Sequence, residues 1–266
     1  MKDQTEHSVH RIIEIIDRLR GPNGCPWDRR QKRGDVGRYL LEEVYEVIDA
    51  IDQASPDSLK EELGDVLFQI LFLAKMAEEK GEFTIADVVN GISEKMIFRH
   101  PHVFKNAQAL EVGEVRANWE RLKNREKGKG EDEAPPIDAV PRSMPPLMAA
   151  HKITGRAAKL GFDWKDTSGV MEKIEEELAE LREAISEGRK DRIEGEIGDM
   201  FLSLVNLCRF VQTNPEDTLR SSLERFTARF SFIEESLKKE GRPPQGATME
   251  EMDLLWNAAK ETERDR

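Results

Sequence analysis

The chain has little of what marks disulfide-rich, membrane-spanning or nucleic-acid-binding proteins. Of its 266 residues only Cys25 and Cys208 are cysteines, and their wide separation argues against a disulfide framework and favours a reducing cytoplasm. No apolar run approaches the roughly 20 residues of a membrane-spanning helix, and the charged segment 1–20 does not resemble a signal peptide. The net charge of −12 argues against a nucleic-acid backbone as the main partner, although metal ions and local basic residues would still permit a nucleotide to bind.

The chain also lacks strand patterns, in which Val, Ile and Thr alternate with polar residues between turns. Apolar residues recur instead at helical spacing, beginning with a stripe in segment 12–19, so we predict an all-α protein. Further helices are expected over 39–54, 57–80, 84–96 (capped by Thr84), 111–126, 147–160, 168–187, 191–212, 215–240 and 248–263. Segment 127–146, rich in proline and charge, is predicted to link a domain at 1–126 to a second at 147–266.

Four carboxylates recur at the same spacing in both halves. Glu43 and Glu46 are followed, after an interval of fifteen positions, by Glu62 and Asp65. The second set repeats this pattern at one constant offset and consists of Glu177, Glu180, Glu196 and Asp199. Positions i and i+3 share a helix face, and the interval lets one helix end and another return antiparallel, so each set can converge. Four converging anions require a cation, and oxygen ligands favour Mg²⁺ or Mn²⁺.

The alternative to a metal is compensation by salt bridges. A single Glu-x-x-Glu pair is more typical of a solvated helix face, but Glu62 and Asp65 border an apolar stripe, as Glu196 and Asp199 do. Acids beside a packed seam destabilise the fold unless something neutralises them. Either a divalent cation or Lys and Arg side chains would satisfy that requirement.

Basic and aromatic residues also recur. Lys95 and Arg99 are one helical turn apart, and Arg225 and Arg229 repeat this spacing in the second half. Alone they would be ordinary surface charges, but beside carboxylate–metal sites they indicate phosphate clamps. Weaker candidates of the same kind are Lys123 and Lys173. Late in each half stands a tryptophan, Trp119 and Trp256, which either packs in a core or stacks on a nucleobase.

The repeats together indicate a tandem duplication. The four tryptophans pair at one constant offset, Trp27 with Trp164 and Trp119 with Trp256. The segment Gly24-Cys-Pro-Trp27 is echoed by Gly161-Phe-Asp-Trp164. His100 and His102 have no counterpart in the second half, so we assign them to loop structure and capping. The period is too long for a solenoid, so each half is expected to be a domain-sized helical unit.

These motifs resemble those of the MazG family of nucleoside triphosphate pyrophosphohydrolases over nearly the whole chain. The matching segments are Gly24-Cys-Pro-Trp-Asp28, Leu41-Glu-Glu-Val-Tyr-Glu46, Glu61-Glu-Leu-Gly-Asp65, Arg99-His-Pro-His-Val-Phe104, Gly161-Phe-Asp-Trp164, Glu175-Glu-Glu-Leu-Ala-Glu180 and Glu196-Ile-Gly-Asp199. The resemblance implies Mg²⁺-dependent hydrolysis of nucleoside triphosphates to monophosphate and pyrophosphate. It also implies four-helix-bundle-type cores completed by a homodimer.

The resemblance also implies roles for individual residues. The two carboxylate sets would be the metal ligands, and the nucleotide contacts of the second half would be Lys173, Arg192, Arg225, Arg229 and Trp256. In the first half, Arg99 and Lys123 match residues that matter in relatives. One departure is the run Gln31–Gly37, whose two glycines weaken helix formation at the first half's substrate entrance. We favour the second half as the active one because its nucleotide contacts match more fully.

The sequence supports one mechanism and two rivals. The carboxylates would hold Mg²⁺ and lower the pKa of a bound water, and Glu42 or Glu176 would take its proton before attack on the α-phosphorus. Pyrophosphate would then leave against the basic residues. The rivals are a helical nucleotide sensor or scaffold with structural metals, and a house-cleaning enzyme for one modified base.

Overall fold

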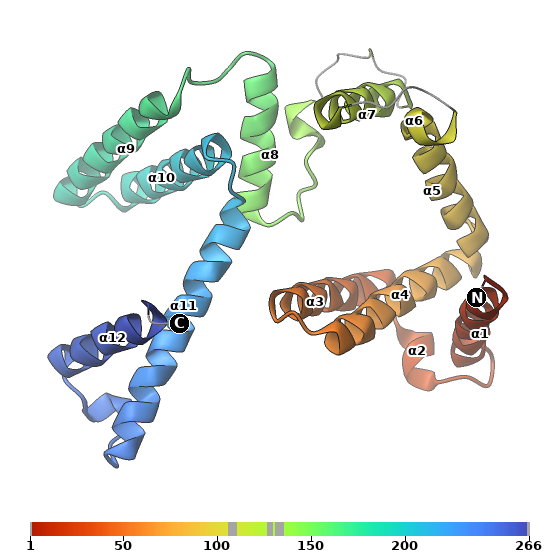
Figure 1. Cartoon of the computed structure of the whole chain (residues 1–266), viewed down its shortest axis with the longest axis horizontal. Coiled ribbons are helices and arrows are strands. Elements are labelled where there is room, and N and C mark those ends of the chain that lie inside the picture. The colour runs from red at the N-terminus through yellow and green to blue at the C-terminus, as the bar shows by residue number, and fades with distance from the viewer. Residues whose placement is uncertain (1, 106–110, 127–129, 131–135, 265–266) are drawn as a thin grey trace. The chain divides into compact units, whose positions relative to one another are not determined.

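The computed structural model describes residues 2–105, 111–126, 130 and 136–264, and within these ranges it contains helices and no strand (Figure 1). The prediction of an all-α protein is confirmed. The chain divides into two compact units, Met1–Asp132 and Glu133–Arg266. None of the described helices combines the length and apolar character that crossing a bilayer requires.

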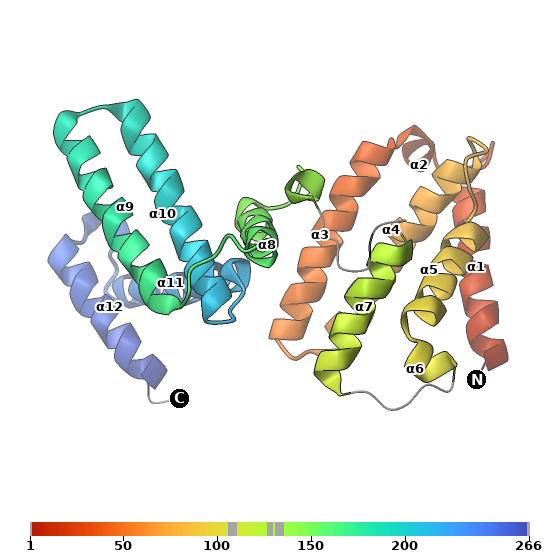
Figure 2. The ribbon, with the colours of Figure 1, turned by 90° about the horizontal axis from the view of Figure 1, so that it is seen from above.

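The first unit contains a long antiparallel helix hairpin, α3 (Arg33–Asp52) and α4 (Pro56–Glu78). Ser55 begins α4 by accepting a hydrogen bond from the Ser58 amide, and Thr84 caps α5 (Ile85–Arg99) in the same way, as predicted. The other helices are α1 (Lys2–Arg20), α2 (Pro26–Arg30), α6 (Pro101–Phe104) and α7 (Val112–Glu126). Helix α5 packs on both α4 and α7, and Figure 2 shows these helices from above.

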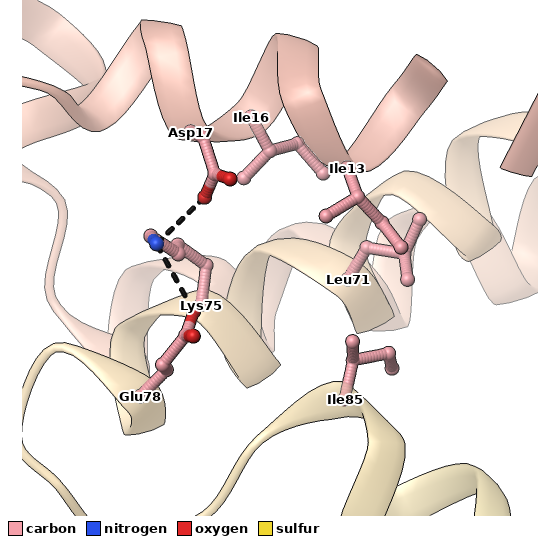
Figure 3. A pocket seen from close by; sticks show the side chains of 7 residues that line it. All are labelled: Ile13, Ile16, Asp17, Leu71, Lys75, Glu78 and Ile85. Carbon is pink, nitrogen blue, oxygen red and sulfur yellow. Dashed lines mark hydrogen bonds and ion pairs between the residues drawn. The ribbon is translucent and has the colours of Figure 1, made fainter. Parts of the chain in front are cut away.

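The core of this unit joins α1 to the hairpin. Ile16, Val36 and Phe72 are almost fully buried and form one cluster with Leu71 and Met76. Figure 3 shows the edge of this core, where the Lys75 ammonium group lies 2.6 Å from Asp17 of α1 and 3.0 Å from Glu78. The isoleucine stripe of α1 therefore packs against α4, and the ion pair between Asp17 and Lys75 lies at the edge of this contact.

Helix α3 begins well before the position that the sequence indicated. We expected a start at residue 39 because Gly34 and Gly37 disfavour a helix, but the helix begins at Arg33 and runs through both glycines. Asp35 accepts a hydrogen bond from the Lys32 amide at 3.0 Å, which caps the first turn. Val36, 1 % exposed, packs in the core. This tertiary packing outweighs a propensity penalty of about 1 kcal/mol per glycine.

The second unit repeats the hairpin as α9 (Thr167–Glu187) and α10 (Lys190–Phe210). Asp166 caps α9, and Gly188, with a φ of 68°, ends it. The remaining elements are the 3₁₀ turn η1 (Ile137–Ala139), α8 (Pro146–Lys159), α11 (Pro215–Lys239), the 3₁₀ turn η2 (Pro244–Gly246) and α12 (Met249–Arg264). Of the segment 127–146 that was expected to be a linker, residues 127–129 and 131–135 lie outside the described residues. The described remainder includes η1, and Arg156 of α8 donates a hydrogen bond to the Pro136 carbonyl oxygen at 2.7 Å.

The duplicated Gly-x-x-Trp motif forms a tight turn in each unit, for different physical reasons. A Cβ atom at Gly24 would overlap the carbonyl oxygens of Arg18 and Leu19 at the end of α1. Gly161 has open space around it but a φ of +89°, which L-amino acids rarely adopt. After the second turn, Trp164 packs against Gly169 in the first turn of α9.

Candidate metal and nucleotide sites

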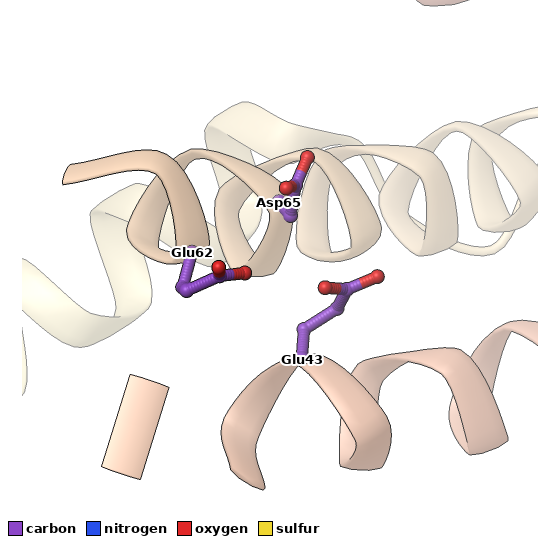
Figure 4. A group of neighbouring side chains, drawn as sticks. All are labelled: Glu43, Glu62 and Asp65. Atoms are coloured by element: carbon purple, nitrogen blue, oxygen red, sulfur yellow. The ribbon is translucent and has the colours of Figure 1, made fainter. Parts of the chain in front are cut away.

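Three of the four predicted acids converge on the first hairpin. One carboxylate oxygen from each of Glu43, Glu62 and Asp65 lies within 4.8 Å of the others. Figure 4 shows Glu43 on α3 pointing across the hairpin towards the two acids of α4. The i, i+3 spacing of Glu62 and Asp65 places them on the same side of α4. Glu46, the fourth predicted member, lies outside this group of three but within hydrogen-bonding reach of Glu62.

The carboxylates of the first cluster repel one another and are partly buried. Burial and repulsion from Asp65 and Glu46 raise the pKa of Glu43 above its ordinary value. Burial and the neighbouring Glu46 likewise raise the pKa of Glu62. Gln69 donates a hydrogen bond of 3.5 Å to Glu43, which partly offsets these effects. The arrangement favours protons or a cation over three free carboxylates.

The second hairpin brings together Glu177, Glu196 and Asp199, again with one oxygen of each within 4.8 Å. Glu177 is only 4 % exposed. Unlike the first cluster, this one includes basic partners: Lys173 Nζ lies 2.7 Å from Glu177, and Arg192 Nε lies 3.7 Å from Glu196. Glu180, the fourth predicted ligand, is half-buried and lies outside the group of three.

Two of the predicted nucleotide contacts are therefore ion-paired within the chain. Lys173 also contacts Glu176, one of the two predicted bases, at 2.8 Å, and Arg192 contacts Glu183 and Glu187, both at 2.9 Å. The other predicted base, Glu42, is exposed on α3. Salt bridges, the alternative to a metal, thus explain part of the charge balance in the second cluster.

The donor sets fit a divalent cation. Each cluster offers several carboxylate oxygens, the ligands that Mg²⁺ and Mn²⁺ prefer, and neither contains the thiolates or imidazoles that favour zinc. Burial and neighbouring carboxylates raise the pKa values of Glu43 and Glu62, and a cation bound there would relieve the repulsion. His100 serves as a structural residue, as predicted: it stands between α5 and α6, and its Nδ1 lies 2.8 Å from the Met96 carbonyl oxygen.

The remaining predicted nucleotide contacts lie on other helices. On α11 and α12, the Arg229 guanidinium group lies over the Trp256 ring at 5.3 Å and pairs with Glu263. On α5 and α7, Arg99 lies over Trp119 at 5.2 Å and pairs with Glu126. Lys123 also lies over Trp119, at 4.8 Å. Lys95 is 4.0 Å from Glu126, and Arg225 is near enough to Glu263 to affect it electrostatically.

Both tryptophans are half-buried. Trp256 lies 5.2 Å from the ring of Phe226, beside an apolar hollow of about 260 Å³. The hollow is lined by Phe226, Phe230, Ile233, Met249, Met252, Asp253 and Trp256. Trp256 therefore packs against Phe226 and also lines the hollow.

Sequence reasoning missed Lys260 and the carboxylates that pair with the arginines. Glu126 and Glu263 are separated by the same offset as the paired tryptophans, and Lys260 follows Lys123 at that offset too. Lys260 contributes to the electrostatic environment of Glu263. The offset already known from the tryptophans would have found all three.

Within the described part of each unit, the acidic hairpin does not contact the helix that carries the tryptophan, although one hairpin helix contacts the arginine helix, α4 with α5 and α10 with α11. Among the described helices of the second unit, α9 packs on α10 and α11 on α12, and neither α11 nor α12 contacts α9. Figure 1 shows the hairpin and the α11–α12 pair diverging from the junction with α8. In the described part of the first unit, α7 packs on α5 and contacts neither α3 nor α4.

Comparison with known proteins agrees with the site motifs. A family model for the MazG nucleotide pyrophosphohydrolase domain matches residues 31–104 and 166–232, which include both acidic hairpins. The chain is 44% identical over 251 residues to the nucleoside triphosphate pyrophosphohydrolase/pyrophosphatase MazG of Thermotoga maritima, covering 94% of each protein. It is 40% identical over 264 residues to the nucleoside triphosphate pyrophosphohydrolase of Escherichia coli K12, covering 97% of this chain and 99% of that protein.

A crystal structure of a MazG-related protein from Thermotoga maritima aligns with 43% of this chain and 97% of that one, with a TM-score of 0.38 and 28% sequence identity. The family model and the two full-length relatives decide the assignment. The chain belongs to the MazG nucleotide pyrophosphohydrolase family.

Proposed function

We propose that the protein hydrolyses nucleoside triphosphates to nucleoside monophosphate and pyrophosphate with a divalent cation, most simply Mg²⁺. The observation that carries this proposal is the pair of carboxylate clusters, one on each duplicated hairpin. Membership of the family and the names of the full-length relatives support the same reaction class.

In the proposed reaction, the oxygen of a water molecule bonds to the α-phosphorus, and the bond to the oxygen bridging the α- and β-phosphorus breaks. A divalent cation bound by the clusters would lower the pKa of a coordinated water and screen the triphosphate charge. Glu42 and Glu176 are the proposed proton acceptors, each adjacent in sequence to a cluster ligand. Arginine and lysine side chains would stabilise the charge that develops on the pyrophosphate.

Lys173 and Arg192 have a second use in this scheme. A cation held by Glu177 and Glu196 would take one carboxylate partner from each of the two basic side chains, and phosphate oxygens would compete for the donors released. Lys173 would still contact Glu176, and Arg192 would still contact Glu183 and Glu187. The same pairs would stabilise the hairpin before the cation and nucleotide bind. We therefore retain both as proposed nucleotide contacts.

We also propose that a second copy of the chain completes each site. In each unit as far as it is described, the helix that carries the tryptophan, α7 or α12, contacts neither helix of the acidic hairpin, and the arginine helix contacts only one of them, α5 on α4 and α11 on α10. Beside the acids, α4 exposes Leu63, Leu67 and Ile70, and α10 exposes the residues at the equivalent positions of its repeat, Ile197, Phe201 and Leu204. A homodimer would cover these stripes.

The test is release of pyrophosphate from a panel of nucleoside triphosphates with Mg²⁺, run in ¹⁸O-labelled water. The label should enter the monophosphate and not the pyrophosphate. Replacing Glu43, Glu46, Glu177 and Glu180 together by Gln should lower kcat/KM at least about 100-fold. A matched control carries Glu61→Gln and Glu172→Gln, exposed acids on the same helices as cluster ligands. Full activity of the fourfold variant would refute the scheme.

A further inference from the structure

The two units share a constellation of five side chains that the acidic clusters do not include. In the second unit it comprises Arg225 and Arg229 on α11 with Trp256, Lys260 and Glu263 on α12, and in the first unit Lys95 and Arg99 on α5 with Trp119, Lys123 and Glu126 on α7. The spacing is i, i+4 for each basic pair and i, i+4, i+7 for each Trp–Lys–Glu set, so each set occupies one helix face. The contacts α11–α12 and α5–α7 bring these faces together.

The carboxylate contacts one edge of the arginine in both units. Arg229 donates from Nε and Nη2 to Glu263, with its shortest bond, Nη2 to Oε2, at 2.7 Å. Arg99 donates from Nε at 2.9 Å and from Nη2 at 2.6 Å to Glu126. Each guanidinium group also lies over the tryptophan ring of its unit. The carboxylate and the ring together restrain the orientation of the arginine.

The Nη1 nitrogen of these two arginines distinguishes them from an arginine whose role is only structural. The described part of the chain contains no hydrogen-bond partner for Nη1 of Arg229 or of Arg99. Arg20 provides the comparison: it also lies over an aromatic ring, Phe72, and makes the same two-point contact with Glu79. Its Nη1, however, donates to the Asp28 carbonyl oxygen at 2.6 Å, so all three nitrogens are used inside the fold.

We propose that Glu263, and Glu126 in the first unit, are positioning residues that hold the arginine with its Nη1 edge presented to a phosphate group of the nucleotide. The inference rests on the proposed function and adds to it a pair of acids on the basic side of the site. A fixed guanidinium group loses less conformational freedom when it binds an oxyanion, and its remaining edge can donate two parallel hydrogen bonds. Arg229, Arg225 and Lys260 lower the pKa of Glu263, so the carboxylate is charged at neutral pH.

Two other roles of Glu263 would have different effects on nucleotide binding and stability. If Glu263 were a competitor that occupies Arg229 until a phosphate displaces it, removing its charge would improve nucleotide binding. If the pair were only a brace between α11 and α12, removing it would lower stability and leave the KM unchanged. Positioning alone predicts weaker nucleotide binding at nearly unchanged stability.

The experiment uses the full chain with one half silenced, so that the other half reports. One variant combines Glu263→Gln with Glu43→Gln and Glu46→Gln, which inactivate the first half. The other combines Glu126→Gln with Glu177→Gln and Glu180→Gln, which inactivate the second half. The result is read from the variant whose remaining half hydrolyses the nucleotide before Glu263 or Glu126 is changed. We expect the KM for the triphosphate to rise about tenfold, with kcat within about twofold and little change in Tm. In an Arg229→Lys (or Arg99→Lys) background, the same substitution should have no further effect, because the carboxylate acts through the arginine.

Two controls separate the possible outcomes. Glu261→Gln removes the same charge from an exposed position on α12 and should leave the KM unchanged. Glu79→Gln breaks the comparison pair and should lower Tm without affecting the KM. An unchanged or lowered KM for Glu263→Gln, or a full effect retained beside Arg229→Lys, would overturn the inference. Absence of pyrophosphate release from the unmodified protein would instead refute the proposed function itself.

Discussion

Lys173 Nζ lies 2.7 Å from the carboxylate of Glu177, a side chain that the second unit buries almost completely. At the offset that relates the two acidic sets, the first-unit counterpart of Lys173 is Tyr39, and the counterpart of Arg192 is Ser58. The second acidic cluster therefore has basic partners at two positions where the first cluster has uncharged side chains. This difference leads to different expectations for the two hairpins in the absence of metal.

Replacing Lys173 by Met should destabilise the second unit when divalent cations are chelated. The change leaves Glu177 buried without its partner, at a cost of about 1–2 kcal/mol, less than for a fully buried pair because Lys173 is one third exposed. Thermal unfolding in EDTA should show a lowered Tm, and Mg²⁺ should restore much of it. Lys190→Met, which breaks an exposed pair with Glu194, should have no such effect. If Mg²⁺ did not reverse the fall in Tm, the expectation that Mg²⁺ can replace the Lys173 ammonium group beside Glu177 would be wrong.

Cation binding to the first hairpin should depend on pH. The pKa values of Glu43 and Glu62 are raised, so both carboxylates hold their protons at a higher pH than usual, and a cation must displace those protons. Affinity should fall as the pH drops towards the raised values. Because these pKa values are higher in the folded state than in the unfolded state, repulsion within the cluster destabilises the metal-free fold at pH values above them. This destabilisation disappears when the pH falls below them and the carboxylates are protonated.

Calorimetric titration of Mg²⁺ into a protein carrying Glu177→Gln and Glu180→Gln tests this dependence. Measured in two buffers of different ionisation enthalpy, binding should release protons at pH 5 and almost none at pH 8. Adding Glu43→Gln should abolish both the binding and the release. Equal affinity at the two pH values would show that the carboxylates bind no protons that the cation must displace.

Mixing two inactive variants should restore activity if each site is shared between copies. One variant carries Glu177→Gln and Glu180→Gln, the other Arg225→Ala and Arg229→Ala, and both carry Glu43→Gln and Glu46→Gln. After mixing and subunit exchange, half of the dimers would be mixed, and each would contain one intact second-unit site, giving about a quarter of the parent activity. A site built within one chain would give no recovery, as would a monomer in sedimentation analysis.

Three glycine substitutions should rank by the space around each position. Gly24→Ala, whose Cβ overlaps backbone oxygens, should destabilise by about 3 kcal/mol, and Gly161→Ala, strained by its positive φ, by about 1–2 kcal/mol. Gly34→Ala, in open space within α3, should stabilise by about 0.5–1 kcal/mol. Urea unfolding of the three proteins checks the order. A neutral Gly24→Ala would mean that the turn after α1 relaxes easily.

The sequence predicted the hairpins and the convergence of their acids because that information is local. The spacing Glu62-x-x-Asp65 fixes a helix face, and the fifteen-position interval fixes an antiparallel return. Convergence of Glu43 with these two acids followed from the periodicity together with the antiparallel return. The predicted fourth members, Glu46 and Glu180, lie outside the groups of three. The start of α3 could not be predicted in this way, because it depends on Val36 entering a core built by α1 and α4.

The relation between the acidic and basic groups was also beyond sequence reasoning. Motifs indicate which residues share a function but not whether one chain brings them together. Arg229 and Glu177 belong to α11 and α9, which make no direct contact within the described second unit, although α10 contacts both. The Arg229–Glu263 pair was missed for a simpler reason: glutamate is abundant in this chain, and Glu263 gains meaning only once its partner is visible.

The packing of α1 sets the limits within which the halves can be separated experimentally. The matched family segment begins at residue 31, but Ile16, 2 % exposed, fills the space between Val36, Leu71 and Phe72. A fragment trimmed to that segment would carry a void where Ile16 packs and would lose the Arg20 partner of Glu79, a loss of about 3 kcal/mol or more. If such a fragment showed no activity, the cause would be its destabilised fold and not the absence of a catalytic site. Fragments made to test the first half should therefore include α1.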